Sequence, residues 1–347
     1  MHLSDFDYYL PPEFIAQTAV EPRDWSRLMV LKRETGTIKH HHFGEIIDFL
    51  HAGDLMIFND SRVIPARLNG HKMDTGAKCE IFLLRKLENS VWETLVKPAK
   101  RIRTGTKVEI SGSSSTLSGF RLEGEVITEK ENGVRIFRFS SEELLFKAGS
   151  IPLPPYIHKK LPDPERYQTI YSRIDGSVAA PTAGLHFTGG LLNDIKAKGV
   201  ELAFITLHIG LGTFQPVREE NPMQHEMHSE YYELSADVAA QISRAKKEGR
   251  RIICVGTTTV RTLEQAAEYR DDDNGLKPSS GWTQLFILPG YKFRMVDALL
   301  TNFHLPRSTL LMLVSAFADR DFLMQSYQEA IKEHYRFYSL GDAMLII

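Results

Sequence analysis

Hydrophobic and polar positions follow one another differently along this chain. Near the N-terminus, the apolar run 54–58 leads into the polar segment 59–62, which predicts a strand followed by a functional loop. From about residue 70 to residue 150, short β-rich runs are separated by Gly, Ser and Asn, a pattern typical of a small all-β barrel or sandwich. These runs cover 80–84, 91–96, 107–110, 121–127 and 134–139.

After the proline-rich segment 151–155, helical and strand patterns alternate. Gly199 and Gly249 stand where helix C-terminal caps belong, and Ser235 is a candidate N-cap. Repeated alternation of strands and helices favours a mostly parallel α/β sheet. We expect helices over 191–198, 235–248, 260–269, 308–318 and 321–334, and strands over 201–209, 251–255 and 283–288.

These patterns predict a mixed α/β fold class, in which a larger α/β domain carries an inserted small, all-β, barrel-like domain. We place the α/β main domain at 1–69 plus 151–347 and the β insert at 70–150. The Ser-rich run 111–115 is predicted to be a hairpin tip rather than a domain linker, because it is too short to separate two rigid domains.

Composition and charge exclude some function classes. The chain has 347 residues, and its 42 Lys and Arg against 44 Asp and Glu give a net charge of -2. A protein that only coats nucleic acid should be strongly basic, so this net charge argues against passive coating while a small basic patch stays open. The N-terminus does not resemble a signal peptide, and the longest apolar stretch, 310–318, is too short for a membrane helix. We therefore expect a cytoplasmic protein that does not enter a membrane.

Cysteine and histidine spacings give no metal or disulfide motif. The two cysteines, Cys79 and Cys254, belong to no paired motif, which excludes a disulfide framework and a cysteine-based zinc site. The histidines at 40–42 and 225–228 lack the spacing of metal ligands. We predict no metal site.

The segment 255–264 is a candidate anion site. It reads as a strand, a Gly-Thr loop and a helix, and such a turn aims backbone N–H groups and the positive helix end outward. The hydroxyls of Thr257 and Thr258 and the guanidinium of Arg261 would strengthen it. The spacing is neither a P-loop nor a dinucleotide fingerprint. A threonine-rich helix cap without a ligand is the alternative.

Two histidines stand beside glycines in segments where a catalytic or binding role is open. The loop 176–188 is small, apolar and nearly uncharged, and Thr182 and His186 are among its few polar side chains. His208 lies at the end of a predicted strand, beside a turn at 210–214, where open α/β sheets bind ligands. Histidines packed in the core are the alternative in both cases.

Charged residues gather in two further segments. Asp60 and Arg62 directly follow the apolar run 54–58, and Arg67 comes shortly after. A catalytic role is open here, and so is an ion pair between Asp60 and an arginine that braces the loop.

The second segment, 97–107, holds five basic residues and no acid. With Lys97, Lys100 and Arg101, it is the best candidate for contact with a phosphate backbone, solvated surface charge being the alternative.

Asn302, His304 and Asp342 lie in polar segments that are flanked by strongly apolar sequence. Buried hydrogen-bond networks or a functional site would each explain them.

Taken together, these segments resemble the S-adenosylmethionine:tRNA ribosyltransferase-isomerases, a family of queuosine-pathway enzymes. Each motif alone is ambiguous, but so many in the right order are specific. The departures are slight: Thr259 stands where serine is expected and Ile209 where valine is usual. The matching motifs are LPPEFIAQ (10–17), RDWSRL (23–28), NDSRVIPAR (59–67), KPAK (97–100), RYQT (166–169), SVAAPTAGLHFT (177–188), HIGLGTF (208–214), MHSEYY (227–232), GTTTVRTLE (256–264), PGY (289–291), LTNFHL (300–305) and GDAM (341–344).

The resemblance implies an enzyme that transfers and isomerises the ribosyl part of S-adenosylmethionine onto 7-aminomethyl-7-deazaguanine at the wobble position of tRNA. The product is epoxyqueuosine in tRNA, with adenine and methionine released. The sulfonium acidifies ribose C5′, deprotonation starts the loss of adenine, and the aminomethyl nitrogen attacks. We expect a monomer whose partners are tRNA and S-adenosylmethionine, the latter a co-substrate, with no metal and no cofactor.

Residue roles follow as hypotheses laid on these motifs. A base must reach C5′–H, and histidine titrates near neutrality without much tuning. The methionine carboxylate suits the Gly-Thr loop, the leaving adenine needs a hydrogen-bond donor, and anticodon phosphates need cations. The catalytic candidates are His186, His208 and Asp60; the substrate-binding candidates are Arg62, Arg67, Thr182, Thr257, Thr258, Arg261, Asn302 and His304; the tRNA-binding candidates are Lys97, Lys100 and Arg101.

Two other classes remain open at this point. An RNA-binding module without catalysis would bind tRNA in a salt-dependent way and turn over no S-adenosylmethionine. A methyltransferase would release S-adenosylhomocysteine rather than adenine, although the chain lacks a glycine-rich dinucleotide-type fingerprint.

Overall fold

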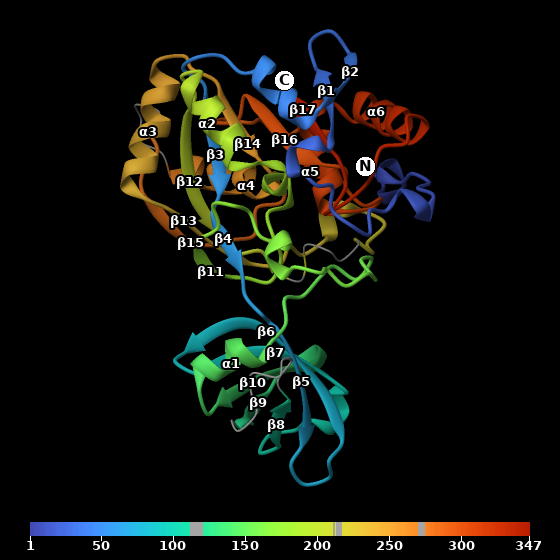
Figure 1. The fold of residues 1–347 in the computed structure, drawn as a ribbon, viewed down its shortest axis with the longest axis vertical. Helices are drawn as coiled ribbons and strands as arrows, with labels where there is room; N and C mark the ends of the chain where they lie inside the picture. The colour runs from blue at the N-terminus through green and yellow to red at the C-terminus, as the bar shows by residue number, and fades with distance from the viewer. Residues whose placement is uncertain (112–120, 211, 213–216, 270–274) are drawn as a thin grey trace. The chain divides into compact units, whose positions relative to one another are not determined.

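The computed structural model describes residues 1–111, 121–210, 212, 217–269 and 275–347, and they form two compact units. The larger unit comprises Met1–Arg62, Pro154–Ile174 and Ala180–Ile347, and the smaller comprises Val63–Leu153 and Asp175–Ala179. The fold is a mixed α/β unit with a closed β-barrel unit, which confirms the predicted fold class (Figure 1). The predicted hairpin tip 111–115 lies, beyond Ser111, outside the described residues.

A nine-stranded sheet is the frame of the α/β unit, with strand order β15-β13-β12-β3-β14-β16-β17-β1-β2. Only β12, β3, β14 and β16 form a continuous parallel block, and β17 also pairs in parallel with β1. The other pairings are antiparallel. The strands are β1 (Arg27–Lys32), β2 (Thr37–His42), β3 (Leu55–Asn59), β12 (Glu201–Leu207), β13 (Glu230–Leu234), β14 (Ile252–Val255), β15 (Ser279–Thr283), β16 (Ala298–Asn302) and β17 (Ala343–Ile346).

The prediction of a mostly parallel sheet is therefore wrong outside the central block and the β1–β17 pair. Antiparallel strands are added at both sides. Between β1 and β2 the connection is short enough to allow direct pairing of consecutive strands, whereas β13, β15 and β17 are brought to their partners by longer segments of chain. The predicted strand 283–288 is also wrong. β15 ends at Thr283, whose hydroxyl accepts a hydrogen bond from the backbone N–H of Leu285 and so turns the chain out of the ladder.

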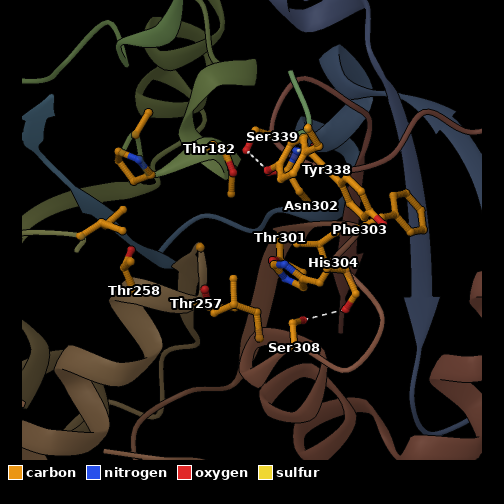
Figure 2. Close-up of a pocket in the computed structure, with 18 residues that line it drawn as sticks. Thr182, Thr257, Thr258, Thr301, Asn302, Phe303, His304, Ser308, Tyr338 and Ser339 are labelled. Atoms are coloured by element: carbon orange, nitrogen blue, oxygen red, sulfur yellow. Dashed lines mark hydrogen bonds between the residues drawn. The ribbon is translucent and has the colours of Figure 1, made fainter. Parts of the chain in front are cut away.

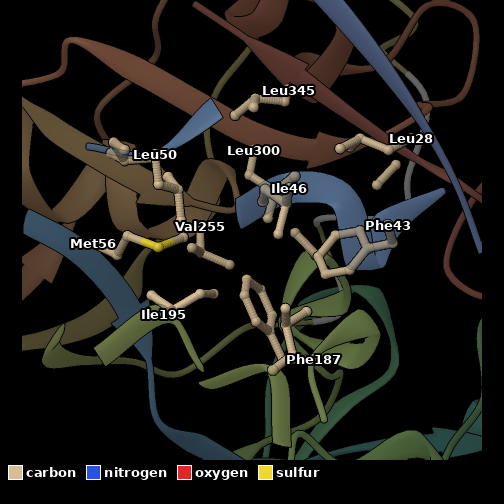
Figure 3. Packing of buried hydrophobic residues seen from close by; sticks show 14 of the residues in the cluster. Leu28, Phe43, Ile46, Leu50, Met56, Phe187, Ile195, Val255, Leu300 and Leu345 are labelled. Carbon is tan, nitrogen blue, oxygen red and sulfur yellow. The ribbon is translucent and has the colours of Figure 1, made fainter. Parts of the chain in front are cut away.

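One face of this sheet carries a large apolar core (Figure 3). Alternate residues of the strands point to the same side, and Met56, Val255 and Leu300 meet Phe43 and Phe187 there. The cover consists of the 3-10 segments Phe43–Phe49 and Thr182–His186 together with α2 (Gly189–Ala197). The loop that carries His186 is thus fixed by the core beside it.

The remaining helices of the α/β unit are α3 (Ala236–Lys247), α4 (Thr257–Ala266), α5 (Thr309–Ala318) and α6 (Arg320–Lys332). Helices α3 and α4 pack against strands β12 and β14. Ser235 caps α3 through a hydrogen bond from the backbone N–H of Val238, as its position before the helix predicted.

The smaller unit is a closed antiparallel barrel with strand order β10-β7-β6-β5-β8-β9. Its first strand begins before residue 70, so the unit starts earlier than the insert that we placed at 70–150. The barrel strands are β5 (Arg67–Lys72), β6 (Lys78–Glu88), β7 (Val91–Lys97), β8 (Lys107–Ser111), β9 (Leu122–Glu129) and β10 (Val134–Phe139), and α1 spans Glu142–Ala148. Strands β4 (Ser61–Val63) and β11 (Ile174–Ser177) pair as a separate ladder.

Candidate active site

A pocket opens where the central parallel strands of the α/β unit end (Figure 2). Its empty volume is about 630 Å³, part of it open to solvent. Three predicted segments meet there: the loop around Thr182, the start of α4, and the end of β16. The described lining residues include no Asp, Glu, Lys or Arg. They are Tyr156, Ala180, Pro181, Thr182, Ala183, Ile209, Gly256, Thr257, Thr258, Thr301, Asn302, Phe303, His304, Leu305, Ser308, Leu310, Tyr338 and Ser339.

The first turn of α4 forms one wall. Gly256 precedes the helix with a φ of 92°, a left-handed conformation that favours glycine, and no side chain caps the helix N-terminus. The helix begins at Thr257 rather than at the predicted residue 260, so Thr257 and Thr258 lie in its first turn. Backbone N–H groups and the positive end of the helix dipole are thus available to an anion at this wall.

Asn302 is held by a dense set of hydrogen bonds. Its side-chain Nδ2 donates to the backbone oxygens of Tyr338 at 3.1 Å and Asp342 at 3.4 Å, and it lies 3.2 Å from His186 Nε2. The backbone N–H groups of Arg27 and Arg336 donate to the carboxylate of Asp342. Asp342 is buried, and burial raises the pKa of its carboxyl. The polar segments around residues 302 and 342 therefore form one buried network.

His186 lies behind Asn302 and does not line the pocket. Its Nδ1 is 2.7 Å from Ser26 Oγ, and its ring stacks on Phe43. Burial, reinforced by the positive charges of Arg166, Arg23 and Arg336, lowers its pKa to about 3. The ring is therefore neutral at pH 7, with both nitrogens engaged. These surroundings favour a positioning role, and the catalytic role stays a prediction.

His304 lines the pocket and is nearly as buried. Its Nε2 lies 2.8 Å from Thr301 Oγ1, and burial lowers its pKa to about 3. Two tyrosines fix its backbone, since the hydroxyl of Tyr8 donates to its carbonyl and its N–H donates to Tyr327. This neutral histidine adds a polar ring to the uncharged lining of the pocket.

Asp60 is buried and has both carboxylate oxygens engaged. Arg173 Nε donates to Oδ2 at 2.6 Å and Thr206 Oγ1 donates to Oδ1 at 2.7 Å. The bracing ion pair that the sequence left open is thus formed, with Arg173 instead of Arg62 or Arg67 as the partner. Asp60 does not line the pocket, and its catalytic role stays a prediction.

The predicted arginines are dispersed. Arg62 is bonded to Ser172 and Glu165 in the α/β unit, while Arg67 belongs to barrel strand β5 and faces Glu80 at 3.8 Å. Neither lines the pocket. A role for them with substrate stays a prediction.

Arg261 lies in a second pocket, with an empty volume of about 440 Å³, rather than beside Thr257. It forms a buried ion pair with Glu230, and its Nε donates to the backbone oxygen of Leu285. The helical spacing explains the separation, because a residue four positions after Thr257 is one turn further along α4. The structure thus does not bring Arg261 to the pocket wall formed by the first turn of α4.

His208 follows β12, and its ring stacks on Tyr231 at a centroid distance of 6.0 Å. Its chain neighbour Ile209 lines the pocket, but the adjoining residues 211 and 213–216 lie outside the described part of the chain. The predicted role of His208 as a base stays a prediction.

The basic segment 97–107 lies on the barrel with all five of its cations exposed. Among the described residues, Lys97, Lys100 and Arg101 have no acidic partner within 4 Å, nor do the other two cations of this segment. Most other barrel arginines and lysines are paired, for example Lys86 with Glu142. Among the described barrel residues, unpaired positive charge is therefore concentrated mainly in this segment.

Arg135, a buried residue of β10, supports that segment. It is 5% exposed, and its guanidinium donates to the backbone oxygens of Ile102 at 2.6 Å and Ala99 at 2.9 Å. Sequence reasoning did not find Arg135, because its role depends on a turn from a different part of the barrel.

Sequence reasoning also missed Ser26, Tyr156, Phe303, Tyr338 and Ser339 as part of the site or its support. Phe303 could have been predicted from the sequence, because it stands between the candidates Asn302 and His304. The serines and tyrosines carried no local signal, since each acts only through a partner distant in sequence, as Tyr156 does with Ser339 at 2.6 Å.

The described part of the structure holds neither a metal-binding cluster nor a helix suited to crossing a membrane. Within its described part, no group of three or more His, Cys, Asp and Glu is arranged to hold a metal ion. Across the same residues, no helix combines the length and apolar character that crossing a membrane requires.

Comparison with known proteins gave matches over the whole chain. The model of a family described as "Queuosine biosynthesis protein" matches residues 3–346. Proteins named S-adenosylmethionine:tRNA ribosyltransferase-isomerase from Dehalococcoides mccartyi and Clostridioides difficile are 53% and 52% identical, with full coverage of both chains. A crystal structure of S-adenosylmethionine tRNA ribosyltransferase from Thermotoga maritima is similar, with 41% identity, a TM-score of 0.57, and coverage of 99% of this chain and 100% of that one.

Proposed function

The chain belongs to the queuosine biosynthesis protein family, and we propose that it transfers and isomerises the ribosyl part of S-adenosylmethionine onto 7-aminomethyl-7-deazaguanine at the tRNA wobble position. The products are epoxyqueuosine in tRNA, adenine and methionine. The observation that carries the proposal is the end-to-end similarity, 53% identity over 347 residues, to a protein with that enzyme's name.

The pocket at the ends of the parallel strands supports S-adenosylmethionine as the ligand there. Open α/β sheets bind ligands at the carboxyl ends of their strands, and this pocket offers aromatic side chains, hydroxyls and a helix N-terminus. Tyr338, which lines the pocket, would pack against the adenine. The N–H groups of Thr257 and Thr258 would hold the methionine carboxylate without help from Arg261, which is paired with Glu230.

Proton transfer at C5′ requires a base near neutrality. Of the three predicted catalytic residues, His186 has both ring nitrogens engaged and Asp60 both carboxylate oxygens. We assign the base to His208 because its chain neighbour Ile209 lines the pocket, whereas neither His186 nor Asp60 does. His304, with Thr301 on its Nε2, would contact the departing adenine.

The basic segment 97–107 supports tRNA as the second substrate. Its exposed cations have no acidic partner among the described residues, so they would meet anticodon phosphates without first breaking an ion pair.

We also propose that the enzyme is a monomer and that it works in the cytoplasm without a metal or cofactor. Sedimentation and metal analysis of the purified protein test its oligomeric state and its metal content.

The decisive experiment is adenine release. Purified chain, S-adenosylmethionine and tRNA with the 7-aminomethyl-7-deazaguanine wobble base are mixed, and liberated adenine is followed chromatographically. We expect adenine only when the modified base is present, with unmodified tRNA as the matched control. Tight tRNA binding without adenine would favour a binding module, and S-adenosylhomocysteine as the product would favour a methyltransferase.

A further inference from the structure

The side-chain amide of Asn302 has one hydrogen-bonding atom that the protein leaves unused. Its Nδ2 donates to the backbone oxygens of Tyr338 and Asp342, whereas its Oδ1 is buried and has no partner. If the amide were turned over, Oδ1 would face two carbonyl oxygens, which only accept hydrogen bonds. The neighbouring carbonyls therefore fix which amide atom is the unused one, and it is an acceptor.

The carbonyl-fixed orientation of the Asn302 amide also determines the hydrogen bonds of His186. The Asn302 amide nitrogen can only donate, so His186 Nε2 must be the bare nitrogen and Nδ1 must carry the proton. Nδ1–H then donates to Ser26 Oγ at 2.7 Å, and the Ser26 hydroxyl donates to the backbone oxygen of Arg23 at 3.3 Å. The donors thus run in one direction, from Asn302 through His186 and Ser26 to Arg23.

The surroundings narrow the class of donor that Oδ1 can accept. Asn302 lines the pocket together with Phe303 and Tyr338, and the described lining has no carboxylate to balance an ammonium group. A buried unpaired acceptor gains most from a neutral N–H group, which meets it without a large desolvation cost. An aromatic ring that carries an amino group fits both the apolar wall and the acceptor.

We infer that Asn302 recognises the adenine of S-adenosylmethionine by accepting a hydrogen bond from its 6-amino group, and that His186 positions the Asn302 amide without touching the substrate. This inference rests on the proposed function. It reverses the role that the motif suggested for Asn302, because its amide hydrogens are directed to Tyr338, Asp342 and His186 and cannot serve as donors to the leaving adenine.

The test compares two ligands on the unaltered full chain. S-adenosylhomocysteine carries no sulfonium and does not turn over, and its analogue with unsubstituted purine in place of adenine lacks only the 6-amino group. We expect calorimetric titration to show the purine analogue binding about 10- to 100-fold more weakly, because the acceptor loses its only donor. Binding of both ligands within threefold would overturn the inference while the proposed function stands.

Two variants sharpen the comparison. Asn302→Leu should bring the two ligands within threefold of each other, because the acceptor is gone. The matched control is Ser326→Ala, which removes a buried hydroxyl bonded to Phe322 on α6 and should keep the full ratio. An undiminished ratio in Asn302→Leu would overturn the inference. Failure of the unaltered chain to bind S-adenosylhomocysteine at all would count against the proposed function itself, and the inference would fall with it.

Discussion

The pocket of the α/β unit and the basic segment 97–107 of the barrel differ in how they present polar groups. The described pocket lining contains no charged side chain, and its histidine and asparagine are buried, bonded and fixed in direction. The basic segment consists of exposed cations with no acidic partner in the described part of the chain. Fixed neutral groups discriminate between ligands by geometry, whereas free cations attract any phosphate backbone and respond to salt.

This difference matches the different needs of the two proposed substrates, S-adenosylmethionine and tRNA. A small ligand must be held in one orientation for reaction at one carbon, so buried groups with a single allowed hydrogen-bond pattern are useful. A large polyanion such as tRNA needs positive charge on the protein surface that it contacts. In the segment 97–107, only the backbone then needs to be fixed. Arg135 does this through the carbonyls of Ala99 and Ile102.

The largest effect should come from neutralising the basic segment. The triple variant Lys97→Ala, Lys100→Ala and Arg101→Ala should weaken tRNA binding about 100-fold near 0.1 M salt. The slope of log affinity against log salt should fall by about 2, because three phosphate contacts to a single strand are lost. Filter binding over a salt series measures both quantities.

The matched control uses cations outside the segment. Lys78 and Arg138 are exposed on the same barrel and also have no acidic partner among the described residues. Their double alanine variant should bind tRNA within threefold of the unaltered chain. Equal losses in the two variants would show that the barrel attracts tRNA through its net charge and not through the segment 97–107.

The barrel, the basic segment and several pocket residues could be predicted from the sequence, because each depends on local sequence patterns. Runs of β-rich residues between glycines identified the barrel, since local alternation and turn chemistry determine such strands. The basic segment was visible because five cations lie within eleven consecutive positions, 97–107. Thr182, Thr257, Asn302 and His304 were identified as candidates by their motifs, and they do line one pocket.

The partners of these residues could not be predicted, because they are brought together by the fold. Asp60 pairs with Arg173, which is 113 positions away, although nearer arginines were available in the sequence. Arg261 stands in the same motif as Thr257, yet it pairs with Glu230 in another pocket. A motif shows which residue types occur together, while the ion pairs depend on how distant strands and helices pack.

The second prediction concerns acid, which should weaken the α/β unit through its neutral histidines. The pKa of His186 is about 3 in the folded protein against 6.5 for an ordinary histidine. Above pH 6.5 the ring is neutral in both states; below it, the unfolded chain takes up a proton that the folded protein does not. The free energy of unfolding should therefore fall by about 2 kcal/mol per such histidine between pH 7 and pH 5.

Chemical denaturation at pH 7 and pH 5 measures this loss. The variant His186→Gln has no titrating ring, so its loss should be smaller than that of the unaltered chain by about 2 kcal/mol. Contributions from His304 and from every other titrating group are common to both proteins and cancel in the difference. An identical loss in both proteins would mean that His186 titrates normally in the folded state.

The third prediction separates a positioning role of His186 from a catalytic one. Glutamine can present an oxygen to the Asn302 amide and an N–H to Ser26, which reproduces the two bonds of the neutral ring. His186→Leu can make neither bond. We expect about a tenfold higher KM for S-adenosylmethionine in His186→Leu and a value within threefold of normal in His186→Gln, with kcat for adenine release little changed in either. A loss of kcat by 1,000-fold or more in both variants would assign the proton transfer to His186 itself.

The smallest effect should follow from Asp60→Asn, which tests the remaining buried carboxylate. An asparagine oxygen can still accept from Thr206, and Arg173 has a side chain that is 66% exposed and can turn to solvent. The free energy of unfolding should therefore fall by only about 1–2 kcal/mol. Adenine release should stay within threefold of normal, because the carboxylate braces a loop and does not line the pocket. If adenine release fell 1,000-fold while the free energy of unfolding stayed nearly unchanged, Asp60 would take part in the chemistry. The catalytic site would then extend beyond the pocket to the residue that follows β3.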